Sequence, residues 1–201
     1  MANTARDPTG PALAVPPLDH FSVLAPYYDR LFMRLNTEAL LAWVAQEAPH
    51  RLLDVGGGTG RVARHFVGRV AQVCVLDPSS GMAREGQRKR ICVIRGEAEW
   101  LPFGTGTFER IIVVDAFHHL RDHTRAASEL LRVLAPGGRL VIEEPDIARW
   151  AVKMVALAER LMRMRSRFHR LGDLQAMFER LGGSGYCERR GTVGWIIVRK
   201  P

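Results

Sequence analysis

The glycine-rich stretch at residues 51–62, RLLDVGGGTGRV, constrains the fold of this chain more than any other. Leu52, Leu53 and Val55 form a short apolar run that ends at glycines, a pattern typical of a buried parallel strand followed by a tight turn. Glycine is needed where the chain turns sharply or where a ligand contacts backbone, because a Cβ atom would block both. We expect a helix over residues 62–67, whose first amides would favour negative or electron-rich groups. Strand, loop and helix therefore predict a nucleotide-binding corner.

The glycine spacing narrows the kind of nucleotide. Gly56, Gly58 and Gly60 follow the pattern G-x-G-x-G, one residue tighter than the dinucleotide fingerprint G-x-G-x-x-G. Asp54 precedes the loop, and its carboxylate would repel a pyrophosphate. It suits a ligand that carries an ammonium group, or it holds the loop amides. The stretch resembles motif I of the class I S-adenosylmethionine-dependent methyltransferases, and an NAD-dependent reductase stays as an alternative.

A second segment supports this resemblance. The sequence ELLRVLAPGGRL at residues 129–140 is highly typical of the same family. The resemblance implies an α/β fold, a Rossmann-like three-layer sandwich with a seven-stranded, mostly parallel sheet and an antiparallel last strand. It covers residues 20–201 as a single methyltransferase domain, with a helical acceptor-side insertion at about residues 147–171. Residues 1–19, rich in Pro, Ala and Thr, read as a flexible leader.

Periodicity and capping residues place the elements. Ser79 or Ser80, Asp122 and Asp173 are expected to cap helices, and Gly137 and Gly138 to end the helix before the fifth strand. A further helix is expected over residues 37–47. Apolar runs predict strands at residues 70–76, 91–94, 108–114, 140–142, 185–189 and 193–198, with Gly191 at or near the last turn.

Two carboxylates are candidates for contacts to the nucleoside. Asp77 ends the second predicted strand about 20 residues after the first glycine, where a carboxylate accepts hydrogen bonds from both ribose hydroxyls; Pro78 then turns the chain. The family resemblance assigns Glu97 and Ala98, in GEAEWLPF, to the adenine edge. The family usually has Asp at the first of these positions, so Glu97 departs from its pattern and the contact shifts or is lost. The alternative is a surface carboxylate in a loop.

The resemblance adds two further cofactor-binding candidates. Asp115 follows the predicted central strand at residues 108–114. Tyr28 belongs to an F…A…YD pattern that begins at Phe21 and is similar to an N-terminal element covering the cofactor in methyltransferases of quinone precursors. The alternative for Phe21 and Tyr28 is that both are core aromatics under a cap.

Four side chains are candidates for a catalytic base. His118 and His119 lie after the central strand, and imidazole has a pKa suited to proton transfer at neutral pH. The alternative is that one histidine packs beside the helix and the other faces solvent. Glu143 and Glu144, at the end of the fifth strand, carry similar weight. The sequence indicates no activated Ser or Cys nucleophile and no metal site.

The charge and the cysteines of the sequence limit the possible partners and the cellular compartment. The net charge of +8 would suit nucleic acid, but residues 149–170 alone hold seven Arg or Lys and one Glu, so 7 − 1 = +6 of it lies in one segment. This segment predicts an amphipathic helix that packs on the core or lies on an anionic membrane. We expect no nucleic-acid partner. Three widely spaced cysteines and no apolar span of 18 residues favour a reducing cytoplasm.

The sequence thus predicts a cytoplasmic enzyme that transfers a methyl group from S-adenosylmethionine to a small, apolar or aromatic acceptor. The F…A…YD element and the EEPD ending of the fifth strand favour an acceptor similar to a quinone precursor. The alternatives are a cofactor-binding protein without transferase activity, the reductase named above, and an RNA methyltransferase whose binding would depend on salt. The acceptor atom and the oligomeric state stay open.

Overall fold

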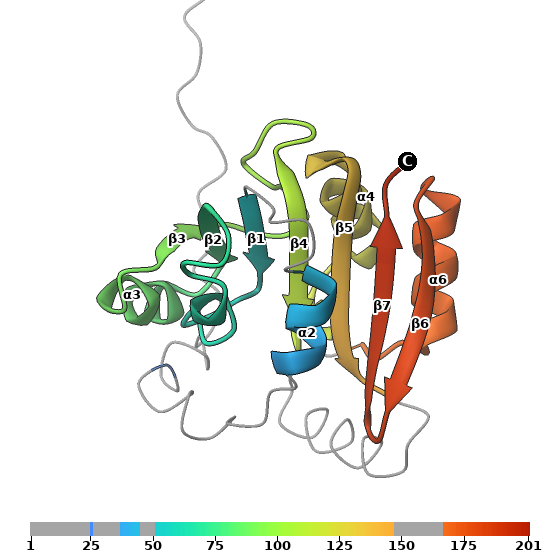
Figure 1. Cartoon of the computed structure of the whole chain (residues 1–201), viewed down its shortest axis with the longest axis horizontal. Helices are drawn as coiled ribbons and strands as arrows, with labels where there is room; N and C mark the ends of the chain where they lie inside the picture. The colour runs from blue at the N-terminus through green and yellow to red at the C-terminus, as the bar shows by residue number, and fades with distance from the viewer. Residues whose placement is uncertain (1–24, 26–36, 45–50, 147–166) are drawn as a thin grey trace, which may run out of the picture.

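The structure is a computed structural model of the chain, and it describes residues 25, 37–44, 51–146 and 167–201. Seven strands form one sheet in the order β3-β2-β1-β4-β5-β7-β6 (Figure 1). All pairs from β3 to β5 are parallel, and β7 is antiparallel to both β5 and β6. The predicted sheet is therefore confirmed. The strands are β1 (Arg51–Val55), β2 (Gln72–Asp77), β3 (Cys92–Arg95), β4 (Phe108–Val114), β5 (Leu134–Pro145), β6 (Ser184–Arg190) and β7 (Val193–Arg199).

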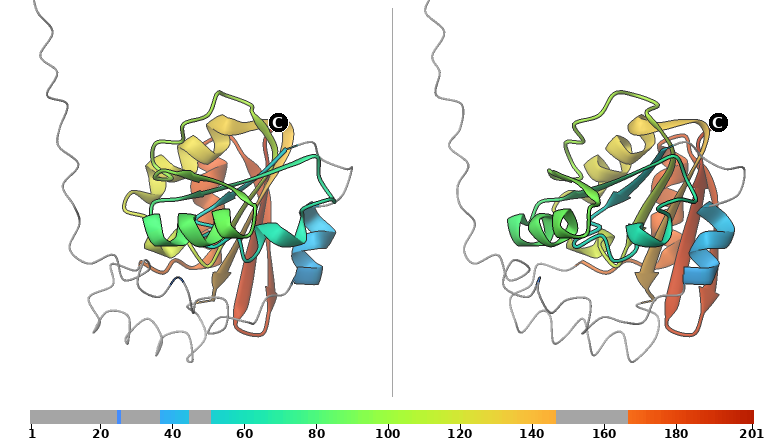
Figure 2. Two further views of the ribbon diagram at one scale, coloured as in Figure 1. Left: turned by 90° about the vertical axis from the view of Figure 1, so that its left-hand side faces the viewer. Right: turned by 60° about the vertical axis from the view of Figure 1, so that its left-hand side comes forward.

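Helices cover both faces of this sheet. The described helices are α2 (Thr37–Val44), α3 (Ser80–Arg88), α4 (His123–Val133) and α6 (Leu171–Arg180), with short 3-10 helices η1 (Ala63–His65) and η2 (Phe117–His119). Figure 2 shows α4 and α6 on one side of the sheet and α2 on the other. The arrangement is the predicted three-layer sandwich.

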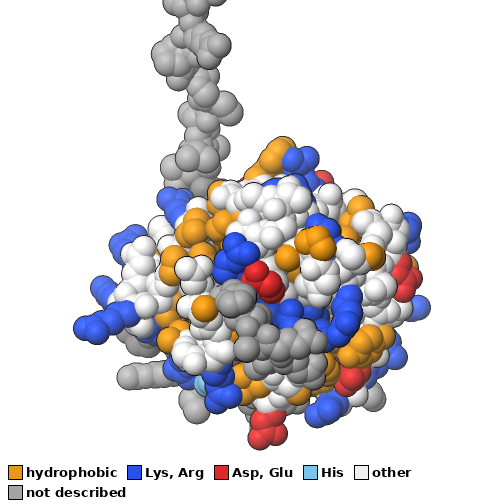
Figure 3. Space-filling model, turned by 45° about the horizontal axis from the view of Figure 1, so that its top comes forward, with side chains coloured by type: hydrophobic (Ala, Val, Ile, Leu, Met, Phe, Trp, Pro, Cys, Tyr) orange, Lys and Arg blue, Asp and Glu red, His pale blue; other side chains and the backbone are white. Residues whose placement is uncertain are grey.

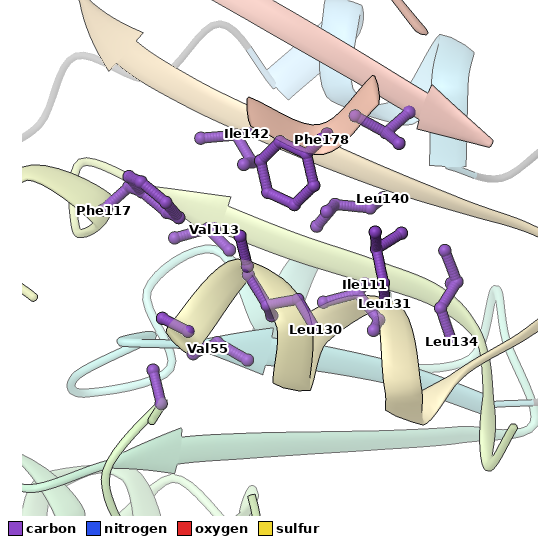
Figure 4. Packing of buried hydrophobic residues seen from close by; sticks show 14 of the residues in the cluster. Val55, Ile111, Val113, Phe117, Leu130, Leu131, Leu134, Leu140, Ile142 and Phe178 are labelled. Carbon is purple, nitrogen blue, oxygen red and sulfur yellow. The ribbon is translucent and has the colours of Figure 1, made fainter. Parts of the chain in front are cut away.

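The central strand β4 shows why helices pack on both faces of the sheet. Its residues alternate between two apolar clusters: Ile111 and Val113 face α4 and α6, while Ile112 and Val114 face α2. Successive side chains of a strand point to opposite faces, so a central parallel strand is apolar throughout. Figure 4 shows the larger cluster, in which the Phe178 ring of α6 lies close to Ile142 of β5. Burying one such side chain is worth about 1.5–3 kcal/mol.

Two of the predicted helix caps are confirmed and one is wrong. The Ser79 side chain accepts from the Met82 amide at the start of α3, and Asp122 accepts from the Arg125 amide at the start of α4. Asp173 does not cap α6, which begins at Leu171. Leu171 is completely buried, and placing it in the core starts the helix earlier. Asp173 lies instead in the first turn, where a negative charge favours the helix dipole.

Two further expectations are corrected. The helix expected over residues 62–67 is only the 3-10 turn η1, because Gly68 has a φ of 79° and reverses the chain, so that Val67 bridges to Val70. The two glycines of the APGG segment do not end α4. That helix ends at Val133 and β5 starts directly at Leu134, pairing with Phe108 on β4.

Several predictions fall on residues that the structure does not describe. These are Tyr28 and Phe21, the leader at residues 1–19, and residues 147–166 of the acceptor-side insertion. In the described part of the chain, no helix has the length and apolarity needed to cross a membrane. Figure 3 shows Lys and Arg side chains distributed over the visible face among apolar and uncharged ones.

Candidate functional site

The loop after β1 requires glycine for backbone reasons. Gly56, Gly58 and Gly60 have φ angles of 70°, 56° and 72°, in the left-handed region that other residues rarely adopt. A Cβ atom on Gly56 would also lie 2.5 Å from the Cβ of Ala116, at the end of β4. The Gly56 amide donates to the Leu76 carbonyl at 2.7 Å. The glycine loop is therefore packed against the carboxyl ends of both β2 and β4.

Asp77 joins the end of β2 to this loop. Its Oδ2 accepts from the Gly58 amide at 2.9 Å, and its Oδ1 accepts from the Ser79 amide at 2.8 Å. The residue is 7% exposed. The two oxygens of a carboxylate offer about four acceptor positions, so a carboxylate at the end of β2 is chemically suited to accept from a ligand hydroxyl. Pro78, between Asp77 and Ser79, turns the chain into α3, as predicted, and its carbonyl accepts from Arg95 Nε at 3.2 Å.

Asp54 and Arg61 bring buried charge to the same loop. In the described part of the chain, no hydrogen bond of ordinary geometry reaches either carboxylate oxygen of Asp54, although the backbone amide of Ala63 acts on this carboxylate, and none reaches Nε or Nη1 of Arg61. Asp54 has no exposed surface, and a Cβ on Gly57 would lie 2.5 Å from its carboxyl carbon. Burial raises the pKa of Asp54 to about 7, while the positive charge of Arg61 acts to lower it. Unpartnered buried polar atoms are costly and favour a polar ligand or water beside them.

The segment after β3 carries the predicted adenine-edge residues. Glu97 is half-exposed, and its Oε1 lies 3.3 Å from Arg121 Nη1. Ala98 is buried. Glu99, which the sequence analysis did not single out, accepts from the Arg121 amide at 2.7 Å and from the Asp122 amide at 3.1 Å. Glu99 thus fixes this segment to the start of α4, and the adenine contact of Glu97 and Ala98 stays a prediction.

Asp115 marks the point where β4 ends. Its φ is 52°, an uncommon value for a residue other than glycine, and its amide donates to the Glu143 carbonyl at 2.9 Å. Non-glycine residues in this region concentrate at functional sites. The neighbouring Ala116 contacts the glycine loop, so Asp115 lies at the same edge of the sheet as Gly56.

His118 and Glu144 form a buried pair at this edge. His118 Nδ1 lies 2.5 Å from Glu144 Oε2, and Glu144 Oε1 accepts from the Phe117 amide at 2.8 Å. Their side chains are 5% and 6% exposed. The His118 ring stacks on Phe168, with centroids 4.4 Å apart and an interplanar angle of 16°. A carboxylate oxygen that faces Nδ1 favours the tautomer in which Nδ1 carries the hydrogen, which leaves Nε2 as the basic nitrogen of the ring.

The other two candidate bases differ from this pair. His119 lies with its ring centroid 4.0 Å from that of His118, and burial together with the nearby His118 lowers its pKa to about 3. It is therefore neutral at physiological pH. Glu143 Oε2 accepts from Trp195 Nε1 at 2.6 Å, and burial raises its pKa to about 7. Adjacent strand residues face opposite sides, so only Glu144 turns toward η2.

A second histidine pair fixes the end of the acceptor-side insertion that was predicted at about residues 147–171. His169 Nε2 lies 2.5 Å from His123 Nδ1, and the His123 ring stacks on Phe117. The Arg167 amide donates to the His118 carbonyl at 2.8 Å. No sequence pattern predicted the His123–His169 and His118–Arg167 contacts, because their partners are separated by more than 40 residues. These contacts hold residues 167–169 against the residues that follow β4.

The structure therefore brings most of the described candidate residues together at the carboxyl ends of strands β1, β2 and β4. Asp54, Asp77 and the glycines share the loop after β1, and Asp115 and His118 follow β4 beside it. Among the residues that the structure describes, no group of three His, Cys, Asp or Glu side chains is placed to hold a metal ion.

Comparisons with known proteins agree with this geometry. Residues 53–142 match the family described as Methyltransferase domain. A solved S-adenosylmethionine-dependent methyltransferase from Thermotoga maritima has 22% identity and a TM-score of 0.75, over 90% of this chain and 98% of that one. Residues 53–142 therefore form a methyltransferase domain, and the solved enzyme shares its fold. The resemblance drawn from GGGTG and APGG is thereby confirmed.

Two curated relatives of this methyltransferase domain carry the same name. The demethylmenaquinone methyltransferase of Thermus thermophilus is 35% identical over 139 residues, which are 62% of this chain and 63% of the relative. That of Beutenbergia cavernae is 34% identical over 131 residues, 64% of this chain and 53% of the relative. The chain thus spans less than two thirds of the length of these relatives.

The residues at the loop fit the cofactor of the methyltransferase family. S-Adenosylmethionine carries an ammonium, a carboxylate and two ribose hydroxyls. The buried oxygens of Asp54 suit the first, the buried guanidinium atoms of Arg61 suit the second, and the carboxylate of Asp77 suits the hydroxyls. Arg61 was not among the residues predicted from the sequence, since a lone Arg after a glycine loop has no distinctive pattern.

Proposed function

We propose that this protein transfers a methyl group from S-adenosylmethionine to a small apolar or aromatic acceptor. The observation that carries the proposal is the set of buried Asp54 and Arg61 side-chain atoms without a regular hydrogen bond among the described residues, beside a glycine loop whose amide donates to Asp77. A quinone precursor is the proposed acceptor class. Support comes from the demethylmenaquinone methyltransferases that align with this chain, and from the F…A…YD and EEPD patterns.

The cofactor-binding part of the proposal assigns one role to each residue. When bound, S-adenosylmethionine supplies a methyl group activated by its positive sulfur. Asp54 and Arg61 bind the amino-acid end, and Asp77 accepts from the ribose. Gly56, Gly58, Gly60 and Pro78 shape the backbone at this point, and Tyr28, Glu97, Ala98 and Asp115 stay as proposed contacts. The protein then mainly has to align the acceptor and exclude water, since proximity alone lowers such a barrier substantially.

The acceptor part rests on His118 and Glu144. A phenol or enol becomes a better nucleophile when it loses its proton, and imidazole removes a proton efficiently near neutral pH. Glu144 fixes the tautomer and the orientation of His118, so that Nε2 acts as the base. Phe168 stacks on this ring and places an apolar surface beside it. We propose His118 as the general base and Glu144 as its positioning residue; His119 is a weaker candidate because its pKa is lowered.

The main alternative is a protein that binds S-adenosylmethionine without transferring its methyl group. The glycine loop would serve both functions equally. The basic segment at residues 149–170 lies mostly outside the described residues, so its contact with an anionic membrane stays a proposal, as does a cytoplasmic location.

Calorimetry followed by an acceptor screen separates these functions. We expect binding of S-adenosylmethionine, and release of S-adenosylhomocysteine with reduced naphthoquinones but not with a structureless RNA. Binding without release for any acceptor would support the binding-protein alternative. Binding of NADH in place of the sulfonium cofactor would contradict the whole proposal.

A further inference from the structure

Two cysteines lie opposite each other at one edge of the sheet. Cys74 of β2 and Cys92 of β3 are register partners in a parallel pair, and their Sγ atoms are 3.9 Å apart. β3 is the terminal strand of the sheet. They are 18 positions apart in the sequence and form no C-x-x-C motif, so this pairing arises only from the strand register.

The strand spacing at this pair is compatible with a disulfide. Neighbouring strands lie about 4.7–4.9 Å apart, within the Cα separation of about 4.4–6.8 Å that disulfides span. Register partners project to the same face, so both thiols point the same way. The sulfur atoms need to approach from 3.9 Å to about 2.05 Å, and rotation of the two side chains brings them closer.

The two thiols differ in access and reactivity. Cys92 is exposed, and Cys74 is partly buried against the core cluster. Burial and the neighbouring thiol raise the pKa of Cys74 to about 12. Because the thiolate is the attacking species, Cys92 reacts first with an oxidant in solution, and Cys74 then resolves the product.

We propose that Cys74 and Cys92 are a redox modification site, at which a small disulfide oxidant converts the two thiols into an intramolecular disulfide that fastens β3 to β2. With oxidised glutathione, the Cys92 thiolate attacks one sulfur and releases one glutathione. The Cys74 thiolate then attacks the Cys92 sulfur of this mixed disulfide and releases the second. Two protein thiols are oxidised, one oxidised glutathione is reduced to two thiols, and reduced dithiothreitol reverses the step.

The disulfide stabilises the terminal strand β3 of the sheet. It closes the segment that contains α3 and Asp77, and cross-linking a segment of this length restricts the unfolded chain. β3 is only four residues long and has one strand neighbour, so it gains most from the link. For a chain of this size we expect a rise in Tm of about 6–12 °C on oxidation.

The test is oxidation of the full chain with oxidised glutathione, followed by intact mass and peptide mapping. We expect the mass to fall by two hydrogens, a cross-link between the peptides that hold Cys74 and Cys92, and the rise in Tm. Cys92→Ser should abolish all three, whereas Cys187→Ser should retain them. Cys187 serves as the control because its Sγ lies 3.1 Å from Gln175 Oε1, on another part of the fold.

Three results would overturn the proposal. Glutathione that stays attached to Cys92 would mean that Cys74 does not resolve the mixed disulfide. A disulfide-linked dimer would mean that the geometry favours another molecule. A bridge that leaves Tm unchanged would refute the stabilising role.

Discussion

Replacing Asp77 by Asn tests the nucleoside end of the proposed site. The carboxylate accepts from the Gly58 amide at 2.9 Å and from the Ser79 amide at 2.8 Å. In Asp77→Asn an NH2 group replaces one of the two acceptor oxygens, and the negative charge is lost. The variant keeps nearly the same shape, so that any effect comes from hydrogen bonding and charge.

The size of the effect of Asp77→Asn on cofactor binding follows from the hydrogen bond that is lost. A hydrogen bond to a charged group is worth about 1.5–3 kcal/mol, so losing one acceptor toward the ribose weakens S-adenosylmethionine binding roughly 10- to 150-fold. The buried amide that loses its partner within the protein adds a stability cost of about 1–3 kcal/mol. The variant should therefore bind the cofactor weakly and also unfold at a lower urea concentration.

Calorimetric titration with S-adenosylmethionine measures the first effect, and urea denaturation measures the second. Asp173→Asn is the matched control, because Asp173 is an exposed residue of α6, and its Kd should stay within twofold of the wild type. If folded Asp77→Asn binds the nucleoside within twofold of the wild type, the assignment of Asp77 to the ribose is refuted.

Four further variants probe the buried charges, the loop, the proposed base and its positioning residue. Burial raises the Asp54 pKa from 3.8 to about 7, so between these pH values the native state keeps a proton that the unfolded state has lost, and this group lowers stability as the pH rises. Glu143, whose pKa is also raised to about 7, contributes in the same direction. Urea titrations at pH 5 and pH 8 should show a smaller loss of stability in Asp54→Asn than in the wild type; an equal loss in the two proteins would contradict this account of Asp54. Gly57→Ala should lower the free energy of unfolding by about 1–3 kcal/mol, because the added methyl group crowds the Asp54 carboxyl. In the control Gly172→Ala the added methyl group meets nothing within 4 Å, so thermal unfolding should show no loss of stability. His118→Gln should lower kcat by about 100- to 10,000-fold with little change in cofactor Kd. Glu144→Gln should lower kcat and shift the pH profile; a normal profile would exclude the positioning role.

The sheet could be predicted because its signals are local. Strand β4 is apolar throughout, as a central parallel strand must be, and the glycine loop has backbone angles that few other residues adopt. The helix expected over residues 62–67 was wrong because the turn at Gly68 outweighs a short apolar pattern. Asp173 was misassigned because burial of Leu171 decides where α6 begins.

The chemistry of the site depends on contacts that no local pattern records. His118 and Glu144 are 26 residues apart, and whether either histidine faced a carboxylate could not be read from the sequence. Arg61, Glu99 and the pairing of Cys74 with Cys92 were missed for the same reason, since each acquires its role from strand register or a tertiary contact.

A crystal structure of the chain with S-adenosylhomocysteine bound tests the central claim most directly. The account predicts both ribose hydroxyls within hydrogen-bond distance of the Asp77 carboxylate, with the ligand ammonium at Asp54 and its carboxylate at Arg61. A nucleoside bound elsewhere, with no ligand group at the Asp54 carboxylate, would contradict it.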